Sequence, residues 1–202
     1  MIYIAENTDR LDESFLKKSE GMLSVQRAEQ LKEYALARDR INGTVAYLLL
    51  RYGLEKEYGI CEKPVFEYRR RGKPYLKDYE IYFNISHCKN AVACIISDKD
   101  TALDVMDIRK IHSGTVRRTC TEDEKNLILS GGQPDRDFIR IWTRKECYSK
   151  FDGRGLLLDF SEINESLPEM NHILTYDMGE YILSCYSEKP VEMVFVSAED
   201  LL

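Results

Sequence analysis

Acidic and basic side chains recur at spacings suited to chemistry in two stretches of this 202-residue chain. In ALDVMDI, residues 102–108, Asp104 and Asp107 interrupt an apolar run that otherwise has the composition of a buried strand. In WTRKECYSK, residues 142–150, Glu146 and Lys150 are four residues apart, which makes them neighbours on one side of a helix. The first pair could bind a hard cation such as Mg2+, and the second could supply a base beside a positive charge.

Each pattern also has a simpler interpretation. Exposed pairs at positions i and i+4 of a helix are common and contribute little to stability. Acids at the end or edge of a strand often face solvent. If the strand is regular, Asp104 and Met106 share one face and Asp107 lies on the other, whereas a local bulge would change this assignment. Spacing alone therefore leaves both a metal site and a solvated surface open.

Two further stretches offer groups that bind anions. NISH, residues 84–87, ends with the hydroxyl of Ser86 and the imidazole of His87, and both can donate hydrogen bonds to phosphate oxygens. RRRGKP, residues 69–74, places four cations around a turn that contains Gly72 and Lys73. Neither a Walker loop nor GxGxxG occurs in the sequence, so a glycine-rich phosphate loop is not expected. A lone histidine is more often structural, and a basic turn is often only solvated.

Mixed helices and antiparallel strands must position these residues. Alternating patterns predict strands at residues 2–5, 65–69, 82–86, 91–97 and 101–108, and again in YILSCYS and EMVFVS near the end. The strands at 91–97 and 101–108 could form a hairpin through DKD. Helices are predicted from about Ser24, with a kink or join at Asn42-Gly43, after the Thr121/Glu124 capping box, and over 137–150 with a stop at Gly153. This combination predicts an α+β architecture.

Composition argues against several classes of protein. The net charge of −6 argues against broad nucleic-acid binding, which needs a strongly basic face. No run approaches the roughly 18 apolar residues of a membrane span, and the N-terminus lacks a signal-peptide pattern, so we expect a cytoplasmic protein with no membrane partner. Six cysteines without a CxxC pair, beside three histidines, favour reduced thiols over a zinc knuckle or a disulfide framework.

The ordered set of motifs resembles the 4'-phosphopantetheinyl transferases of the surfactin-synthetase type. GKP at 72–74, FNISH at 83–87, the acidic strand, WTRKE at 142–146 and GRGL at 153–156 follow the order of that family. The likeness in order and spacing runs from about Ser24 to Leu156. The family signature W-x-x-K-E-[ACS]-x-x-K-x-x-G-x-G-L is filled by Trp142, Lys145, Glu146, Cys147, Lys150, Gly153, Gly155 and Leu156.

The resemblance implies an enzyme that moves 4'-phosphopantetheine from coenzyme A to a serine of an acyl or peptidyl carrier protein. Adenosine 3',5'-bisphosphate is the other product, and the carrier belongs to fatty-acid, polyketide or nonribosomal-peptide biosynthesis. The implied fold has two similar halves related by a pseudo-twofold axis, residues 1–98 and 99–202, with coenzyme A in the cleft between them. A chain with both halves can complete its own site, so we expect a monomer.

The resemblance also assigns roles to individual residues. It implies that Asp104 and Glu146 are magnesium ligands, that Glu146 is the general base, and that Lys150 stabilises or protonates the departing phosphate. The residues it implies for coenzyme A binding are Arg27, Gly72, Lys73, Ser86, His87 and Lys145.

Several positions depart from the family pattern. Met106 stands where the family has a third metal ligand, usually Glu, and a thioether is a poor ligand for a hard cation. Either Asp107 takes this role through a bulge, or water fills the position and two protein carboxylates remain, which we favour. Asn42-Gly43 stands where the family often has Arg-Ser or Arg-Thr contacting the 3'-phosphate, and Gln30 stands where a Lys is frequent. Arg38, Arg40 or the basic cluster at 69–71 could compensate. The alternative function is therefore a weakened relative that binds coenzyme A or a carrier protein without efficient transfer.

Overall fold

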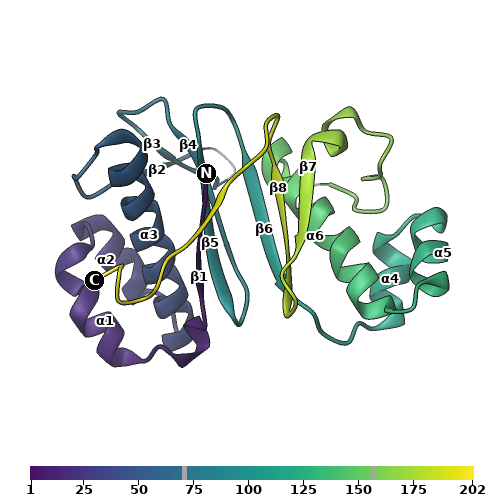
Figure 1. Ribbon diagram of the computed structural model, residues 1–202, viewed down its shortest axis with the longest axis horizontal. Helices are drawn as coiled ribbons and strands as arrows, with labels where there is room; N and C mark the ends of the chain where they lie inside the picture. Colours follow the sequence, from purple (N-terminus) through teal and green to yellow (C-terminus); the bar gives the residue numbers. More distant parts are fainter. Residues whose placement is uncertain (70–71, 156–157) are drawn as a thin grey trace. The chain divides into compact units, whose positions relative to one another are not determined.

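The computed structural model describes residues 1–69, 72–155 and 158–202, and the chain forms two compact units. Unit 1 comprises Met1–Thr101 together with Pro190–Leu202, and unit 2 comprises Ala102–Lys189. Each unit combines helices with antiparallel strands, which confirms the predicted α+β class (Figure 1).

Unit 1 contains a four-stranded sheet of order β4-β5-β1-β9. Strands β4 and β5 form an antiparallel hairpin, β5 also pairs antiparallel with β1, and β9 pairs parallel with β1 at the edge. The strands are β1 (Ile2–Glu6), β4 (Tyr82–His87), β5 (Ala91–Ser97) and β9 (Met193–Phe195), with a separate ribbon of β2 (Phe66–Tyr68) and β3 (Pro74–Leu76). The helices are α1 (Glu13–Ser19), α2 (Val25–Lys32) and α3 (Ala37–Tyr58), with short 3-10 turns at Thr8–Arg10 and Glu20–Met22.

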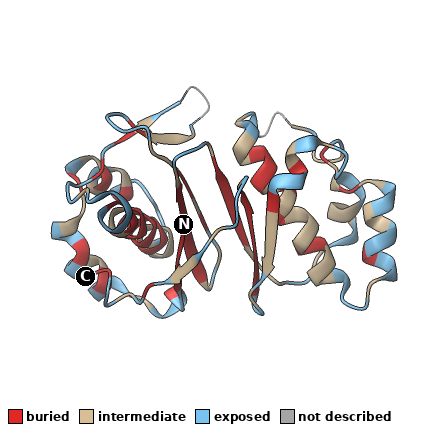
Figure 2. Cartoon of the chain, turned by 45° about the horizontal axis from the view of Figure 1, so that its top comes forward, coloured by how far each residue is buried: buried red, intermediate tan, exposed pale blue. Residues whose placement is uncertain are grey.

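Helix α3 forms the centre of the unit 1 core. It packs against β1, β4 and β5, and Figure 2 shows buried residues concentrated along this helix and on the strands. A Cβ atom at Gly53 would lie 2.4 Å from a side-chain carbon of Ile96 and 2.5 Å from the ring of Tyr3, so glycine permits this close approach of helix and sheet. The helix ends at Gly59, whose φ of 67° is a left-handed cap.

Unit 2 contains a three-stranded antiparallel sheet of order β6-β8-β7, with helix α6 packed on β6 and β8. The strands are β6 (Ala102–Asp107), β7 (Ile173–Asp177) and β8 (Tyr181–Tyr186). The helices are α4 (Ser113–Thr119), α5 (Glu122–Ser130) and α6 (Pro134–Asp152), with a 3-10 turn at Pro168–His172. Helix α5 begins with the predicted capping box of Thr121 and Glu124, and α6 ends at Gly153 with a φ of 76°, as predicted.

The two units repeat one order of elements. Each begins with a strand, continues through short helices to a long helix, and then forms an antiparallel hairpin whose second strand pairs with the first strand of the unit. The resulting sheet order is β4-β5-β1 in unit 1 and β7-β8-β6 in unit 2. The ribbon of β2 and β3 and the added strand β9 distinguish unit 1 from this shared pattern.

Three sequence-based predictions about the elements are wrong. Of the two alternatives at Asn42-Gly43, a kink or a join between helices, the join is wrong, because the dipeptide lies inside α3 and the join to α2 falls at residues 33–36. Both residues are buried, and helix propensity is easily overridden by burial. Strands β5 and β6 do not form a hairpin, since β5 pairs with β4 and β1 while β6 pairs with β8. The expected antiparallel strand in EMVFVS is β9, which is parallel to β1.

The assignment of the last thirteen residues differs from the expected division of the chain. We expected one half to run over residues 99–202, but Pro190–Leu202 belongs to unit 1. Backbone hydrogen bonds from Ile2 to Glu192 and from Val196 to Ile4 tie this segment to β1, and Val196 and Leu201 are buried. The first boundary falls between Thr101 and Ala102.

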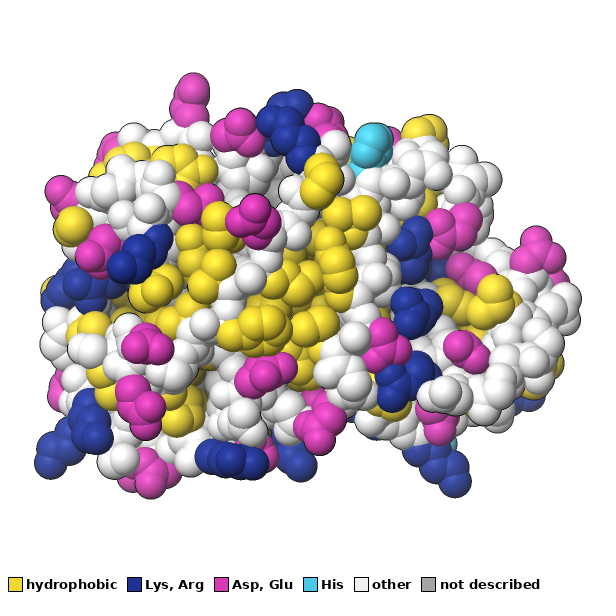
Figure 3. All heavy atoms as spheres, in the orientation of Figure 1, with side chains coloured by type: hydrophobic (Ala, Val, Ile, Leu, Met, Phe, Trp, Pro, Cys, Tyr) yellow, Lys and Arg dark blue, Asp and Glu magenta, His cyan; other side chains and the backbone are white. Residues whose placement is uncertain are grey.

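All six cysteines are free thiols, four of them buried, in agreement with the prediction of reduced cysteine. Within the described residues, no helix is both long enough and apolar enough to cross a membrane. On the face shown in Figure 3, acidic and basic side chains are interspersed.

Candidate functional site

The acidic strand and the motif helix meet within unit 2. Strand β6 pairs with β8 in unbroken register, from Ala102 opposite Tyr186 to Asp107 opposite Tyr181. Because side chains alternate along a regular strand, Asp104 and Met106 share one face and Asp107 lies on the other. The bulge that would turn Asp107 towards Asp104 is contradicted by this register, so the structure does not bring the two carboxylates together.

Lys150 joins α6 to β6 at this face. Its Nζ donates to Asp104 Oδ1 at 2.8 Å and to the Leu103 carbonyl oxygen at 3.0 Å. The side chain of Asp104 is 9% exposed and that of Lys150 is 29% exposed, so the pair is much less solvated than a typical surface pair. The simpler interpretation of the helix pattern, an ordinary surface pair, does not describe Lys150.

Glu146 lies one helical turn before Lys150 on α6. Burial raises the pKa of the Glu146 carboxyl above its ordinary value, and the negative charge of Asp104 raises this pKa further. The ammonium of Lys150 opposes both effects. A carboxylate with a raised pKa is a stronger proton acceptor. A bound cation would also reduce the electrostatic repulsion between the two neighbouring carboxylates.

This donor set fits a magnesium ion held by two protein carboxylates. Mg2+ commonly takes one or two carboxylates and completes its six positions with water and substrate phosphates. Asp104 and Glu146 are two carboxylates near enough for the charge of one to act on the other, so they could serve as this pair of ligands. Met106, on the same face of β6 as Asp104, packs with the apolar cluster that includes Phe138 and Trp142. Within the described residues, no group of three histidine, cysteine or acidic side chains is gathered for a metal.

Lys145 does not belong to this face. Its side chain is 1% exposed, and Nζ donates to Glu124 Oε2 at 2.7 Å and to the carbonyl oxygens of Thr119 and Phe160, each at 2.8 Å. These contacts use all three donors of the ammonium, so Lys145 has none to offer a coenzyme in this arrangement. The predicted role in coenzyme binding is therefore replaced by a structural one.

The partner of Lys145 explains why a lysine is buried here. Glu124 is the acid of the capping box, and its Oε2 also accepts from the backbone N–H of Thr121 at 2.7 Å. One carboxylate thus caps α5 and neutralises the buried charge of α6. Trp142 of the same signature stacks on Phe160, with ring centroids 4.9 Å apart. The last signature residue, Leu156, lies outside the described residues.

A pocket of about 410 Å³ in unit 1 gathers three of the predicted coenzyme contacts, Arg27, Ser86 and His87. Arg27 is 7% exposed, and one of its terminal nitrogens donates to the Gly43 carbonyl oxygen at 2.9 Å. Its buried Nε has no hydrogen-bond partner within the part of the chain that the structure describes. An arginine held in this way keeps donor capacity for an anion in the pocket.

Gly72 and Lys73 are placed elsewhere in unit 1. Lys73 lines a separate pocket of about 190 Å³, where its Nζ donates to Asp100 Oδ1 at 2.7 Å and to the Thr101 carbonyl oxygen at 3.2 Å. Gly72 is exposed and has a φ of 87°, which glycine adopts without strain. The predicted basic cluster at 69–71 is only partly visible, since residues 70 and 71 lie outside the described residues.

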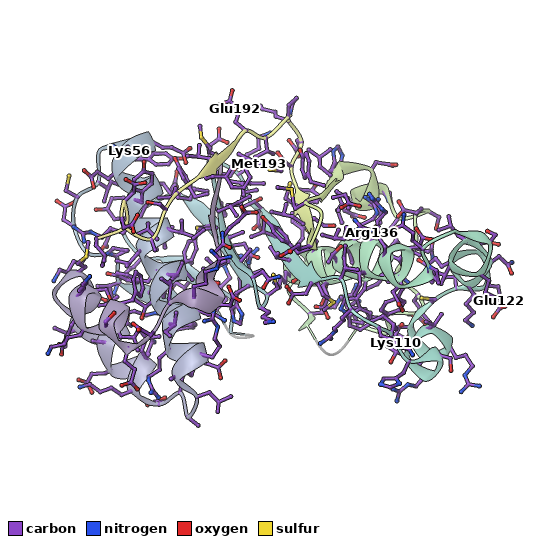
Figure 4. All side chains as sticks on the ribbon, turned by 60° about the horizontal axis from the view of Figure 1, so that its bottom comes forward. Lys56, Lys110, Glu122, Arg136, Glu192 and Met193 are labelled. Carbon is purple, nitrogen blue, oxygen red and sulfur yellow. The ribbon has the colours of Figure 1, made fainter. Side chains whose placement is uncertain are left out.

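Sequence reasoning missed two features. Asn42, interpreted only as a helix breaker and a lost contact, is buried, and its Nδ2 lies 3.3 Å from His87 Nδ1. In unit 2, a pocket of about 350 Å³ has Phe138 and Trp142 beside the basic residues Arg109 and Lys110, the latter labelled in Figure 4. The four-residue spacing of the two aromatic residues was the available signal for this pocket.

Comparison with known proteins gives a consistent picture. The family model described as "4'-phosphopantetheinyl transferase superfamily" matches residues 101–196. The chain is similar to 4'-phosphopantetheinyl transferase gsp of Aneurinibacillus migulanus, with 28% identity over 160 residues that cover 78% of this chain and 66% of the relative, just under two thirds. It is also similar to 4'-phosphopantetheinyl transferase Sfp of Bacillus subtilis (strain 168), with 24% identity over 203 residues that cover 90% of this chain and 91% of the relative.

Proposed function

We propose that this chain is a member of the 4'-phosphopantetheinyl transferase superfamily, whose family model matches its residues 101–196, and that it transfers 4'-phosphopantetheine from coenzyme A to a carrier-protein serine. The apo carrier becomes the holo form, and adenosine 3',5'-bisphosphate is released. The observation that carries this proposal is the face of unit 2 where Glu146, with its raised pKa, lies beside the ion pair of Asp104 and Lys150. These three residues are the ones that the family signature and the acidic strand predicted.

The chemistry assigns one task to each side chain. Glu146 accepts the proton of the serine hydroxyl, directly or through water, as the serine oxygen bonds to the phosphorus that carries pantetheine. The bond from that phosphorus to the bridging oxygen breaks, and Lys150 stabilises or protonates the departing phosphate. The raised pKa of Glu146 suits this task because it makes the ionised carboxylate a stronger base.

We propose that Asp104 and Glu146 hold Mg2+, which would neutralise charge on the pyrophosphate. Calorimetric titration with Mg2+ tests this assignment without transfer activity. Asp104→Asn should weaken Mg2+ binding at least tenfold, whereas Asp107→Asn, on the opposite face of β6, is the matched control and should change it little. Equal losses in both variants would contradict the assignment.

We further propose that Arg27, Ser86 and His87 contact phosphates of coenzyme A, because they line one pocket whose buried arginine keeps an unused donor. Gly72 and Lys73 remain proposed contacts on the adenine side, and the ion pair of Lys73 with Asp100 would have to open for that role. The shared order of elements in the two units supports the proposal that they are two similar halves. A monomeric, cytoplasmic protein that does not bind nucleic acid completes the proposal.

Intact-mass spectrometry of an apo carrier protein tests the function directly. The carrier is incubated with the protein, coenzyme A and Mg2+, beside a reaction with a chelator. A phosphopantetheine mass gain that disappears with the chelator is the expected result. No gain on carriers from fatty-acid, polyketide and nonribosomal-peptide synthesis would contradict it.

The second candidate is a weakened relative, and Met106 in place of the usual acid is the observation that favours it. Calorimetry with coenzyme A, run on the same preparation, separates the two candidates. Coenzyme A binding without transfer to any carrier would support the second.

A further inference from the structure

Helix α3 buries a polar side chain that contributes nothing evident to its own stability. Asn42 is 3% exposed in the middle of this 22-residue helix, where asparagine is a poor helix former. Its Nδ2 contacts His87 Nδ1 at 3.3 Å, while its buried Oδ1 has no hydrogen-bond partner within the described residues. A buried amide that is only half satisfied is costly, so its contact with His87 is the feature that needs an explanation.

The contact determines which nitrogen of His87 carries the proton. An amide Nδ2 can only donate, so Nδ1 of the imidazole must accept, and in the neutral ring the proton then lies on Nε2. His87 is the exposed last residue of β4 and lines the 410 Å³ pocket, whereas Asn42 does not line it among the described residues. Any effect of Asn42 on the imidazole in this pocket therefore passes through its contact with His87.

The next residue of α3 holds the second donor of the pocket. Gly43 accepts a hydrogen bond from Arg27 at 2.9 Å, and a Cβ atom at this position would lie 2.6 Å from Leu31 and 3.1 Å from the Arg27 guanidinium. Glycine thus permits α2 and its arginine to approach α3 closely. The dipeptide Asn42-Gly43 therefore contacts both pocket donors. Asn42 contacts the imidazole of His87, and the Gly43 carbonyl oxygen accepts a hydrogen bond from the guanidinium of Arg27.

We propose that Asn42 is a positioning residue for an anion site in the unit 1 pocket, where it holds His87 as an Nε2–H donor beside Arg27. The inference rests on the proposed function in one respect, since the anion we assign to the site is a phosphate group of coenzyme A. Asp39 also lines the pocket, so orientation of the donors matters more here than in a site lined only by cations. The Asn42-Gly43 dipeptide, which stands where the resembled family often has Arg-Ser or Arg-Thr, thus has its own part in the site.

Nitrogen-15 NMR of the imidazole rings tests the tautomer without coenzyme A. The chain has three histidines, so His87→Gln identifies the signals of His87. We expect the Nε2–H tautomer with a hydrogen-bonded Nδ1 in the native protein, and loss of the Nδ1 hydrogen bond in Asn42→Leu, a replacement of similar size. Asn126→Leu, at an exposed position of α5, is the matched control. An Nδ1–H tautomer, or an Nδ1 signal unchanged in Asn42→Leu, would overturn the proposal.

Calorimetry with coenzyme A then measures the consequence for binding. We expect Asn42→Leu to weaken binding about tenfold, comparable to one impaired hydrogen bond to a charged group, and Asn126→Leu to leave it unchanged. In the His87→Gln background, Asn42→Leu should cause no further loss, because Asn42 acts through the imidazole. Additive losses would refute this route. If native protein binds no coenzyme A, the proposed function fails, while the NMR result still decides the role of Asn42.

Discussion

Replacement of Glu146 by glutamine should abolish transfer and, at the same time, make the folded protein more stable. Glutamine has nearly the same shape as glutamate but cannot accept the serine proton at neutral pH. General bases typically contribute 10²- to 10⁴-fold, so we expect transfer to fall by at least about two orders of magnitude. A residue kept only for packing would not show this loss of transfer.

The expected gain in stability follows from the direction of the pKa shift. Burial and Asp104 raise the pKa of Glu146 in the folded state above the ordinary value of 4.5, so between these two values the folded state binds more protons than the unfolded state. The free energy of unfolding therefore falls as pH rises through this window, and the loss is complete above the folded pKa. Glutamine removes that loss, so the two proteins should be equally stable at pH 4 and should differ at pH 8.

The size of this effect is bounded by the setting of the side chain. One unit of pKa displacement corresponds to about 1.4 kcal/mol, and Glu146 is only partly buried, so solvent reduces the value. We expect a gain on the order of 1 kcal/mol at pH 8, which for a protein of this size raises Tm by about 2–4 °C.

Thermal unfolding with a chelator present, at pH 4 and pH 8, measures stability, and intact mass of the carrier measures transfer. The chelator matters because bound Mg2+ would stabilise the native protein through Glu146 itself. A glutamine variant that is less stable at pH 8 than the native protein would refute the electrostatic argument. Transfer at a near-native rate would remove Glu146 from the mechanism.

Three further substitutions follow from the same geometry. Lys150→Met removes the charge that lowers the pKa of Glu146, so the loss of transfer on acidification should begin at a higher pH in a pH–rate profile. Lys145→Met leaves Glu124 without its buried ammonium and should cost about 3–5 kcal/mol in urea unfolding, with coenzyme A affinity unchanged in the folded fraction. Met106→Glu should lower Tm without Mg2+, because the acid enters an apolar cluster on the face of Asp104, and added Mg2+ should restore Tm. A Tm that does not change with Mg2+ would show that position 106 does not reach the metal.

The sequence predicted elements whose signals are local. The capping box of Thr121, the glycine stop of α6 and the alternating strands were all found where expected, because a few neighbouring residues determine them. The pairing of β6 with β8 and the parallel pairing of β9 depend on residues far apart in the chain, and no local pattern encodes them.

The candidate site shows the same division. Helical spacing placed Glu146 and Lys150 together, but it could not show that Lys150 would pair with Asp104 on a strand 46 residues away. The family signature implied a functional role for both Lys145 and Glu146. Successive residues of a helix point about 100° apart, however, and the side chain of Lys145 points into the interior. The contact of Asn42 with His87 joins a helix to a strand 45 residues later, which no spacing rule predicts.

Strand β9 has a consequence for synthesis on the ribosome. The edge of β1 that β9 covers is translated before unit 2, and its partner β9 is translated only after all of unit 2. Until then the nascent chain exposes the unpaired edge of β1, a strand whose first four side chains are buried in the folded protein. Exposed strand edges of this kind pair with strands of other chains and lead to aggregation. We therefore expect a message truncated before the codon for Pro190 to yield an aggregation-prone product, and slow translation of unit 2 to prolong dependence on chaperones.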